Sequence, residues 1–269
     1  MRWHLCWICL SLWLAFCAGT AVAQPESAGG TQTLAAGSSK RFGLVIANSA
    51  YQHIGVLPNP ANDAREMAAV LRRMAVSVEV LLDADRKTML AALARLSRAT
   101  EHADLAIVHY SGHGIEISGT NYLLPTSAEL NKPGDADTQA IAFEHVYAAV
   151  SNTRGLKLIL LDACRDNPLA GRLGLAPRRG LSAPFPPNDV LVAYATRHGE
   201  VAEDGPPGST SPFTAALLKN INQSVDVRVM FRQVVADVLA ATGYRQSPFI
   251  YGHFGRGEYL LVPKDARSP

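Results

Sequence analysis

Two short motifs in this sequence could supply a nucleophile and its base. Ser111-Gly112-His113-Gly114 places a histidine between glycines, and Asp162-Ala163-Cys164-Arg165 contains a cysteine. A cysteine attacks as the thiolate, so an adjacent imidazole is needed to accept or balance its proton. Glycines beside His113 let a peptide backbone approach, and the amides of Gly114 and Cys164 could stabilise an oxyanion. The pattern therefore predicts a catalytic dyad of Cys164 and His113.

Two other interpretations of these residues compete with the dyad. Cysteine is among the most buried residue types, so Cys164 taken alone would more often be an inert core residue. His109 and His113 are four residues apart, which on a helix is the spacing of a zinc pair. They lie instead on an apolar segment that runs into glycines, without an HExxH motif or a carboxylate cluster. We therefore expect no metal site.

A parallel sheet is the element that could bring the two motifs together. Short apolar segments alternate with amphipathic ones, which is typical of a parallel sheet covered by helices on both faces. Ligands bind outside the carboxyl ends of such strands, and each motif begins where an apolar segment ends. The expected elements are strands at 42–47, 78–82, 104–110, 156–162, 190–195 and 258–262, a hairpin at 115–125, a helix capped by Asn62 or Asp63 and running to Met74, a helix capped by Asp85 and running through Ala99, and helices near 211–222 and 226–242.

The first 23 residues resemble an export signal. Arg2 is followed by an apolar run from Leu5 to Ala18 and by the small-residue cleavage site Ala21-Val22-Ala23. The apolar run is shorter than the roughly 20 residues that span a bilayer, so we expect no membrane span after cleavage. The sequence thus predicts an exported protein, periplasmic or extracellular, whose mature chain keeps Cys164 as its single cysteine.

Composition excludes several classes of protein. The chain has 269 residues, of which 48% are hydrophobic, and 25 basic side chains nearly balance 23 acidic ones. Such a chain is too apolar to be disordered and has no electrostatic footprint for nucleic acid. No glycine-rich nucleotide motif follows the first expected strand. We expect a flexible linker at 24–40, one folded domain at 41–263 with a Gly-, Pro- and Arg-rich connection at 169–189 between parts 41–168 and 190–263, and a tail at 264–269.

With these elements in place, the two motifs resemble the histidine and cysteine motifs of the caspase-like cysteine peptidases. The cysteine lies 164 − 113 = 51 residues after the histidine, close to the roughly 50 typical of caspases. The likeness extends over about residues 41–262 and implies an α/β fold, a caspase-like three-layer α/β/α sandwich with a mostly parallel sheet of about six strands. It also implies cysteine endopeptidase activity, with a catalytically silent peptide-binding or signalling module as the alternative.

The bacterial metacaspase and orthocaspase branch is the most similar part of that family. Caspases proper carry Gln two residues before the cysteine, where this chain has Asp162, and metacaspases carry an Asn-Asp pair at the place of Asn62-Asp63. The resemblance implies that Asp63, Asp162 and Ser111 form an acidic specificity pocket. Such a pocket favours a peptide or protein substrate cut after Arg or Lys, because a cation stabilises a buried carboxylate.

Each pocket residue also has a simpler interpretation. Asp63 could merely cap its helix, Asp162 could bond a neighbouring backbone amide, and Ser111 could be a turn former. In the family, the segment after the fifth expected strand lines the cleft. The backbone near Ala195 and Thr196 is therefore expected to pair with an extended peptide. The nearby acidic residues Glu200, Glu203 and Asp204 are expected to lie in a solvated loop, with a contribution to an acidic cleft as the alternative.

Calcium dependence and self-cleavage are two further properties found in the family. Many metacaspases require calcium, but residues 140–144 (AIAFE) and Gly171 supply few of the oxygen ligands that calcium needs, so no cofactor is expected. Arg172, Arg178 and Arg179 lie in the long connection where caspases are cut. An enzyme that cleaves after arginine could process itself there, and a basic surface loop is the alternative.

Overall fold

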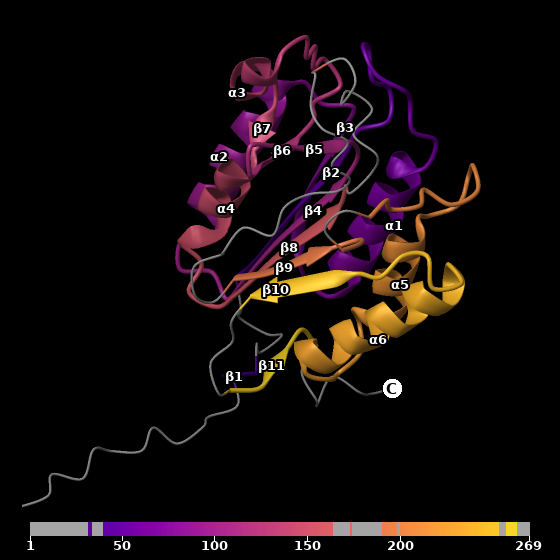
Figure 1. Ribbon diagram of the computed structural model, residues 1–269. Coiled ribbons are helices and arrows are strands. Elements are labelled where there is room, and N and C mark those ends of the chain that lie inside the picture. Colours follow the sequence, from indigo (N-terminus) through magenta and orange to yellow (C-terminus); the bar gives the residue numbers. More distant parts are fainter. Residues whose placement is uncertain are drawn as a thin grey trace, which may run out of the picture.

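A six-stranded sheet forms the middle layer of the protein (Figure 1). The computed structural model describes residues 32–33, 40–163, 173, 190–197, 200–252 and 257–262. The strand order is β10-β9-β8-β4-β2-β3, and every pairing is parallel except that of β10 with β9. The strands are β2 (Arg41–Ala47), β3 (Ser77–Leu82), β4 (Leu105–Ser111), β8 (Leu156–Asp162), β9 (Val190–Tyr194) and β10 (Phe249–Gly252).

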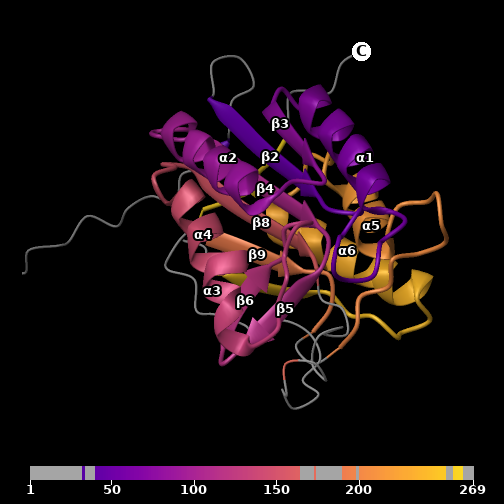
Figure 2. The ribbon, with the colours of Figure 1, turned by 90° about the horizontal axis from the view of Figure 1, so that it is seen from above.

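Helices cover both faces of this sheet (Figures 1 and 2). On one face lie α1 (Pro60–Arg73), α5 (Pro212–Asn220) and α6 (Val227–Ala241), and on the other lie α2 (Arg86–Ala99), α3 (Ala136–Gln139) and α4 (Phe143–Ser151). A short 3-10 helix, Pro133–Asp135, precedes α3. The predicted three-layer α/β/α sandwich with a mostly parallel sheet is confirmed.

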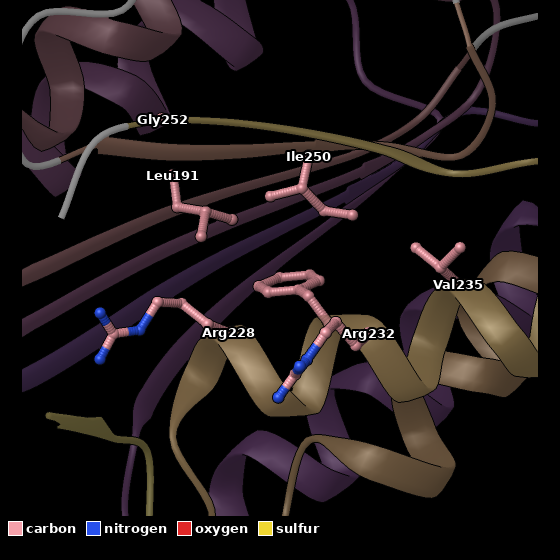
Figure 3. A pocket seen from close by; sticks show the side chains of 7 residues that line it. Leu191, Arg228, Arg232, Val235, Ile250 and Gly252 are labelled. Carbon is pink, nitrogen blue, oxygen red and sulfur yellow. The ribbon is translucent and has the colours of Figure 1, made fainter.

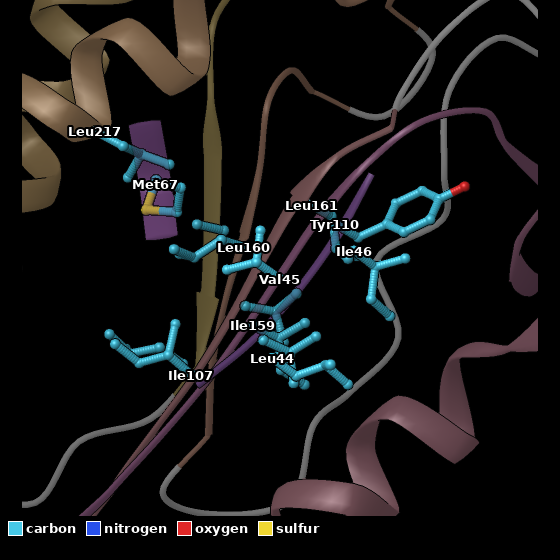
Figure 4. Close-up of a cluster of buried hydrophobic side chains, with 14 of the residues drawn as sticks. Leu44, Val45, Ile46, Met67, Ile107, Tyr110, Ile159, Leu160, Leu161 and Leu217 are labelled. Atoms are coloured by element: carbon cyan, nitrogen blue, oxygen red, sulfur yellow. The ribbon is translucent and has the colours of Figure 1, made fainter. Parts of the chain in front are cut away.

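The central strands are buried along their whole length because helices cover them from both sides. All seven residues of β4 and all seven of β8 are buried. Figure 4 shows Met67 of α1 and Leu217 of α5 on one side of the strands, and Ile46 and Tyr110 on the other. This two-sided burial explains why the strands appear in the sequence as near-continuous apolar runs rather than as alternating patterns.

Of the two helix starts predicted from capping residues, that of α2 is confirmed and that of α1 is wrong. Asp85 caps α2, and its side chain accepts a hydrogen bond from the Thr88 amide, as expected. Helix α1 begins earlier than expected, at Pro60 after Asn59, because Pro is well suited to the first helical position. Asp63 therefore lies inside the first turn and does not cap the helix, so that simpler interpretation of Asp63 is wrong.

The predicted hairpin is present directly after the histidine motif. Strands β5 (Gly114–Ile117) and β6 (Thr120–Leu123) pair antiparallel and form a separate three-stranded sheet with β7 (Ile141–Ala142). Ser118 and Gly119 have φ values of 53° and 88°. Two successive positive φ angles are the mark of a two-residue turn whose twist matches the strands.

The C-terminal end of the chain differs from the expectation. The strand expected near 258–262 is β11 (Tyr259–Leu260), which pairs with β1 (Gln32–Thr33) and not with the main sheet. The sixth strand of the main sheet is β10, which the sequence did not reveal because it is short, exposed at both ends and bounded by Pro248 and Gly252. Gln32 and Thr33 lie in the segment expected to be a linker, whose other residues up to 39 fall outside the described part.

The expected export signal, 1–23, and the tail, 264–269, also fall outside the described residues. No helix in the described part of the chain is both long and apolar enough to cross a membrane.

Candidate active site

The two motif-bearing strands are neighbours. β4 and β8 pair in parallel, with Ser111 opposite Asp162, and the Gly112 amide donates to the Asp162 carbonyl (3.2 Å). His113 and Cys164 each follow two residues after a member of this matched pair. The adjacency on which the dyad depends is therefore present. Cys164 itself lies outside the described residues, as do Arg172, Arg178, Arg179 and His198.

His113 is held at the end of β4 with a defined tautomer. The side chain is buried, and its Nε2 lies 2.8 Å from the carbonyl oxygen of Gly55. A carbonyl can only accept, so Nε2 carries the hydrogen and donates it. The neutral ring then has its basic lone pair on Nδ1. The ring of Tyr51 packs against the imidazole, with 4.6 Å between ring centroids.

Two tyrosine hydroxyls fix the backbone around His113. Its amide donates to Tyr51 Oη (2.7 Å), and its carbonyl accepts from Tyr110 Oη (2.7 Å). The two hydroxyls are 3.2 Å apart and occupy the space where a side chain at Gly112 would begin. A Cβ there would lie 2.6 Å from Tyr51 Oη and 2.7 Å from Tyr110 Oη. Glycine is therefore required at 112 for packing, in addition to any approach of substrate.

Replacing Gly112 by alanine should displace both hydroxyls and with them the His113 backbone. We expect the free energy of unfolding in urea to fall by about 1–3 kcal/mol, as for other overpacked sites. We also expect kcat/KM for a cleaved peptide to fall at least about tenfold, because small misplacements of catalytic groups are costly. Gly134→Ala is the matched control, since nothing lies within 4 Å of a Cβ at Gly134. Equal behaviour of the two variants would contradict this packing role.

The amide of Gly114 is directed away from its hairpin partner. Gly114 lies opposite Leu123, three pairs from the two-residue turn. Pairs alternate between bonded and non-bonded in an antiparallel ladder, and the Leu124 amide donates to the neighbouring His113 carbonyl (3.0 Å). Gly114 thus occupies a non-hydrogen-bonded position. This geometry is compatible with its predicted role in an oxyanion hole, which stays a prediction.

The three residues predicted for the acidic pocket come together beside the strand ends. Asp63, Ser111 and Asp162 are all fully buried, and the Ser111 hydroxyl donates to Asp63 Oδ2 (2.7 Å). The simpler interpretation of Ser111 as a turn former is wrong, because Ser111 is the last residue of β4. The Asp162 carboxylate accepts from two hydroxyls, those of Ser211 and of Thr214, the latter at 3.1 Å.

Ser211 joins the two carboxylates and was not anticipated. Its amide donates to Asp63 Oδ1 (2.9 Å) and its hydroxyl donates to Asp162 Oδ2. Ser211 also caps α5, because its Oγ accepts from the Thr214 amide (2.9 Å). The only signal in the sequence was the Ser-Pro pair at a helix start. That signal locates a cap but cannot indicate which carboxylates the cap reaches.

Burial and mutual repulsion shape the acid–base behaviour of this pair. Burial of Asp63, followed by the charge of Asp162, raises the pKa of Asp63 to about 8, against hydrogen bonds from Ser111 and Ser211 that lower it. Asp204 adds a smaller upward contribution. Two carboxylates in one buried place do not both ionise readily near neutral pH. The Asp63 carboxyl therefore holds a proton until a cation arrives or the pH rises.

The expectation for the strand-addition segment needs a correction at Ala195. The Ala195 amide donates to the Leu161 carbonyl (2.9 Å), and the Ala195 carbonyl accepts from Gln246 Nε2 (2.8 Å). An amide that extends the β8 pairing is not available to donate to a substrate peptide. Thr196 is buried and its hydroxyl donates to Glu200 (2.9 Å). Peptide pairing at the Thr196 backbone stays a prediction.

The acidic residues after Thr196 have partners of their own. Glu200 also lies 3.5 Å from Arg197, and Glu203 forms an ion pair with Arg245 at 2.8 Å.

The side chains of His109 and His113 contact different groups. His109 is fully buried, its pKa is lowered to about 4 by that burial, and its Nε2 lies 3.3 Å from Thr214 Oγ1 on α5. His113 instead contacts Gly55 and Tyr51. In the described part of the chain, no group of three or more His, Cys, Asp or Glu could hold a metal ion.

A cavity of about 500 Å³ lies elsewhere, between α6 and strands β9 and β10 (Figure 3). Leu191, paired with Gly252 near the amino end of β9, lines it together with Phe231 and Ile250. Arg228 and Arg232 lie on its α6 side. This end of the sheet is opposite to the strand ends that carry His113 and Asp162. The cavity therefore does not belong to the candidate active site.

Comparison with known proteins agrees with the fold. A family model described as the caspase domain, within the C14 peptidases, matches residues 40–258. Two curated relatives are the mucosa-associated lymphoid tissue lymphoma translocation protein 1 of Homo sapiens and its homolog in Mus musculus. Each is 26% identical over 125 residues, which is 46% of this chain and 15% of the relative. Because the family model matches most of the chain, this protein belongs to the caspase-domain family of C14 peptidases.

Proposed function

We propose that the protein is a cysteine endopeptidase that hydrolyses peptide bonds after Arg or Lys, with Cys164 as nucleophile and His113 as general base and acid. One observation carries the proposal. Asp63, Ser111 and Asp162 converge where β4 and β8 end, and the two dyad positions follow within two residues of these strand ends. The proposal includes export from the cytoplasm, because residues 1–23 resemble an export signal.

The chemistry follows from the tautomer of His113. Nδ1 accepts the thiol proton of Cys164, and the thiolate attacks the carbonyl carbon before the bond to be cut. The Gly114 and Cys164 amides stabilise the resulting oxyanion. His113 then returns the proton to the leaving amine as the C–N bond breaks. Water, deprotonated by the same imidazole, hydrolyses the thioester and regenerates the thiol. The Gly55 carbonyl stabilises the imidazolium by accepting from Nε2–H throughout.

The buried carboxylates select the residue before the cut. A guanidinium can donate to both oxygens of a carboxylate, and a long Arg or Lys side chain carries its charge deep into a pocket. Two carboxylates held by Ser111 and Ser211 have an unfavourable charge balance that a cation relieves. A neutral side chain would leave them without this compensation. The same pocket therefore explains a preference for basic over neutral residues.

A positional peptide library tests the proposal directly. We expect mature wild-type protein to cleave peptides with Arg or Lys before the cut. For peptides with a neutral residue at that position, kcat/KM should be at least about a hundredfold lower. Asp162→Ala and Asp63→Ala should each reduce this preference for basic residues. Cleavage that shows no preference for a basic residue would contradict the proposed specificity. Full retention of the preference in both variants would show that the pocket lies elsewhere.

A further inference from the structure

A chain of side-chain contacts behind the acidic pocket involves a buried histidine outside the dyad. His109 Nε2 lies 3.3 Å from Thr214 Oγ1, and Thr214 Oγ1 lies 3.1 Å from Asp162 Oδ2. The three residues come from β4, α5 and β8, and all three are fully buried. None of them is exposed to solvent that could exchange hydrogen bonds with it. The direction of each of these two hydrogen bonds therefore follows from the donors and acceptors that the three side chains offer.

The threonine hydroxyl has a single hydrogen and two neighbours that could receive it. A bond from a hydroxyl to a carboxylate is charge-assisted and is roughly twice as strong as one to a neutral ring nitrogen. The hydroxyl hydrogen of Thr214 therefore goes to Asp162. Thr214 Oγ1 is then an acceptor, and His109 must hold its hydrogen on Nε2 to meet it. Burial keeps the imidazole neutral, so one N–H is all that it offers.

We propose that His109 is a positioning residue of the acidic pocket, which by donating to Thr214 commits the Thr214 hydroxyl to Asp162 and so maintains the preference for a basic residue before the cut. This inference rests on the proposed function, because it assigns His109 and Thr214 to the same pocket. Neither residue touches the substrate. They act through Asp162, which does.

The charged and titratable groups around Asp162 determine the expected pH behaviour. Among the described residues they are Asp63 on α1 and His109 on β4, and Asp204 in the segment before α5 acts on Asp63. Removing the Thr214 hydroxyl takes one donor from the ionised carboxylate. Without that donor, Asp162 can also hold the proton that otherwise stays on Asp63, so the carboxylate pair binds the proton more tightly and a cationic side chain displaces it at a higher pH. The loss should therefore be largest at low pH and smaller at high pH.

Paired variants of Thr214 and His109 test this. We expect Thr214→Val to lower the ratio of kcat/KM for an arginyl peptide to that for the matching glutaminyl peptide by about tenfold at pH 7, chiefly through KM. Thr214→Ser should restore the ratio because it keeps the hydroxyl. His109→Leu should lower the ratio about threefold to tenfold, and His109→Gln, which retains an N–H donor, should lose less. The pH at which the ratio reaches half its maximum should rise in Thr214→Val and in His109→Leu.

Thr100→Val is the matched control. Thr100 is also fully buried, and its hydroxyl donates to the Ala149 carbonyl (3.2 Å) on the opposite face of the sheet. Thr100→Val should be destabilised like Thr214→Val yet keep the wild-type ratio of arginyl to glutaminyl cleavage and the wild-type pH profile. The inference is overturned if Thr214→Val and Thr100→Val behave alike while the wild type prefers arginine. If the wild type cleaves no peptide, the proposed function fails, and the pH dependence of thermal unfolding tests the contacts between His109, Thr214 and Asp162. A pH dependence that shifts in Thr214→Val but not in Thr100→Val supports these contacts. An unshifted pH dependence in Thr214→Val overturns the inference.

Discussion

Cys164→Ala should lower kcat/KM for an arginyl peptide at least about a thousandfold, because removal of a catalytic nucleophile leaves only binding and oxyanion stabilisation. His113→Ala should have a comparable effect, since the thiol is only slightly ionised at neutral pH without its base. The two losses should not add in the double variant, because the residues act as one unit. Initial rates of peptide hydrolysis with each purified variant measure this.

A thiol-reactive arginyl peptide probe separates catalysis from mere peptide binding. Labelling at Cys164 that free arginine peptides compete away supports the enzyme, whereas peptide binding without labelling supports a silent module. Thermal unfolding of Cys164→Ala should match that of the wild type, which would show that lost activity is not lost folding. Full activity in Cys164→Ala would exclude the proposed nucleophile.

Asp63→Asn is expected to stabilise the protein and to weaken its selectivity at the same time. The pKa of Asp63 is about 8 in the folded chain against an ordinary value of 3.8. Between these values the unfolded chain has lost the proton and the folded chain has kept it. Wild-type stability therefore falls as the pH rises from about 4 to about 8. Asn has no proton to lose, its Oδ1 can accept from the Ser211 amide and its Nδ2 can donate to the Ser111 hydroxyl oxygen, so it avoids this loss.

Unfolding in urea at several pH values measures the effect. At pH 8 the free energy of unfolding of Asp63→Asn should exceed that of the wild type by at least about 2 kcal/mol, and the difference should vanish near pH 4. In activity assays the ratio of arginyl to glutaminyl cleavage should rise with pH towards about 8 in the wild type and stay flat in the variant. Taking this ratio cancels the ionisation of the dyad, which both substrates share.

Asp85→Asn supplies a control of opposite sign. Hydrogen bonds from Thr88 lower the pKa of the exposed Asp85 carboxyl. Its contribution to stability is therefore present above the unfolded pKa and is lost as the pH falls through the lowered folded pKa. Asp85→Asn should not stabilise the protein at pH 8 and should not change the preference for arginine. A gain at pH 8 in both variants would mean that the effect of Asp63→Asn does not come from its buried pair.

Local patterns in the sequence were sufficient where the structure is set by neighbours in the chain. The apolar runs predicted β2, β3, β4, β8 and β9. All of these except the edge strand β3 are buried on both faces, and such strands carry no alternation. Asp85 and the hairpin turn at 118–119 followed from short-range chemistry. The edge strand β10 was missed because four half-exposed residues have no such signature.

The candidate site divides in the same way. Spacing and resemblance indicated His113, Asp63, Ser111 and Asp162, and the pairing of β4 with β8 brings the last two side by side. Ser211 lies 49 residues after Asp162, and Thr214 lies 105 after His109. No pattern of that length distinguishes a pocket contact from an ordinary helix cap.

The sequence by itself thus determined five of the six strands of the main sheet, the helices α1, α2, α5 and α6 and the positions of the two motifs, because hydrophobic periodicity and turn chemistry act over a few residues. Tertiary structure alone decided that Ser211 and Thr214 also contact the buried carboxylates. Only packing of α1 and α5 against the sheet brings Ser211 and Thr214 to Asp63 and Asp162. Burial of these carboxylates then raises the pKa of Asp63, because removal from water increases the free-energy cost of two neighbouring negative charges.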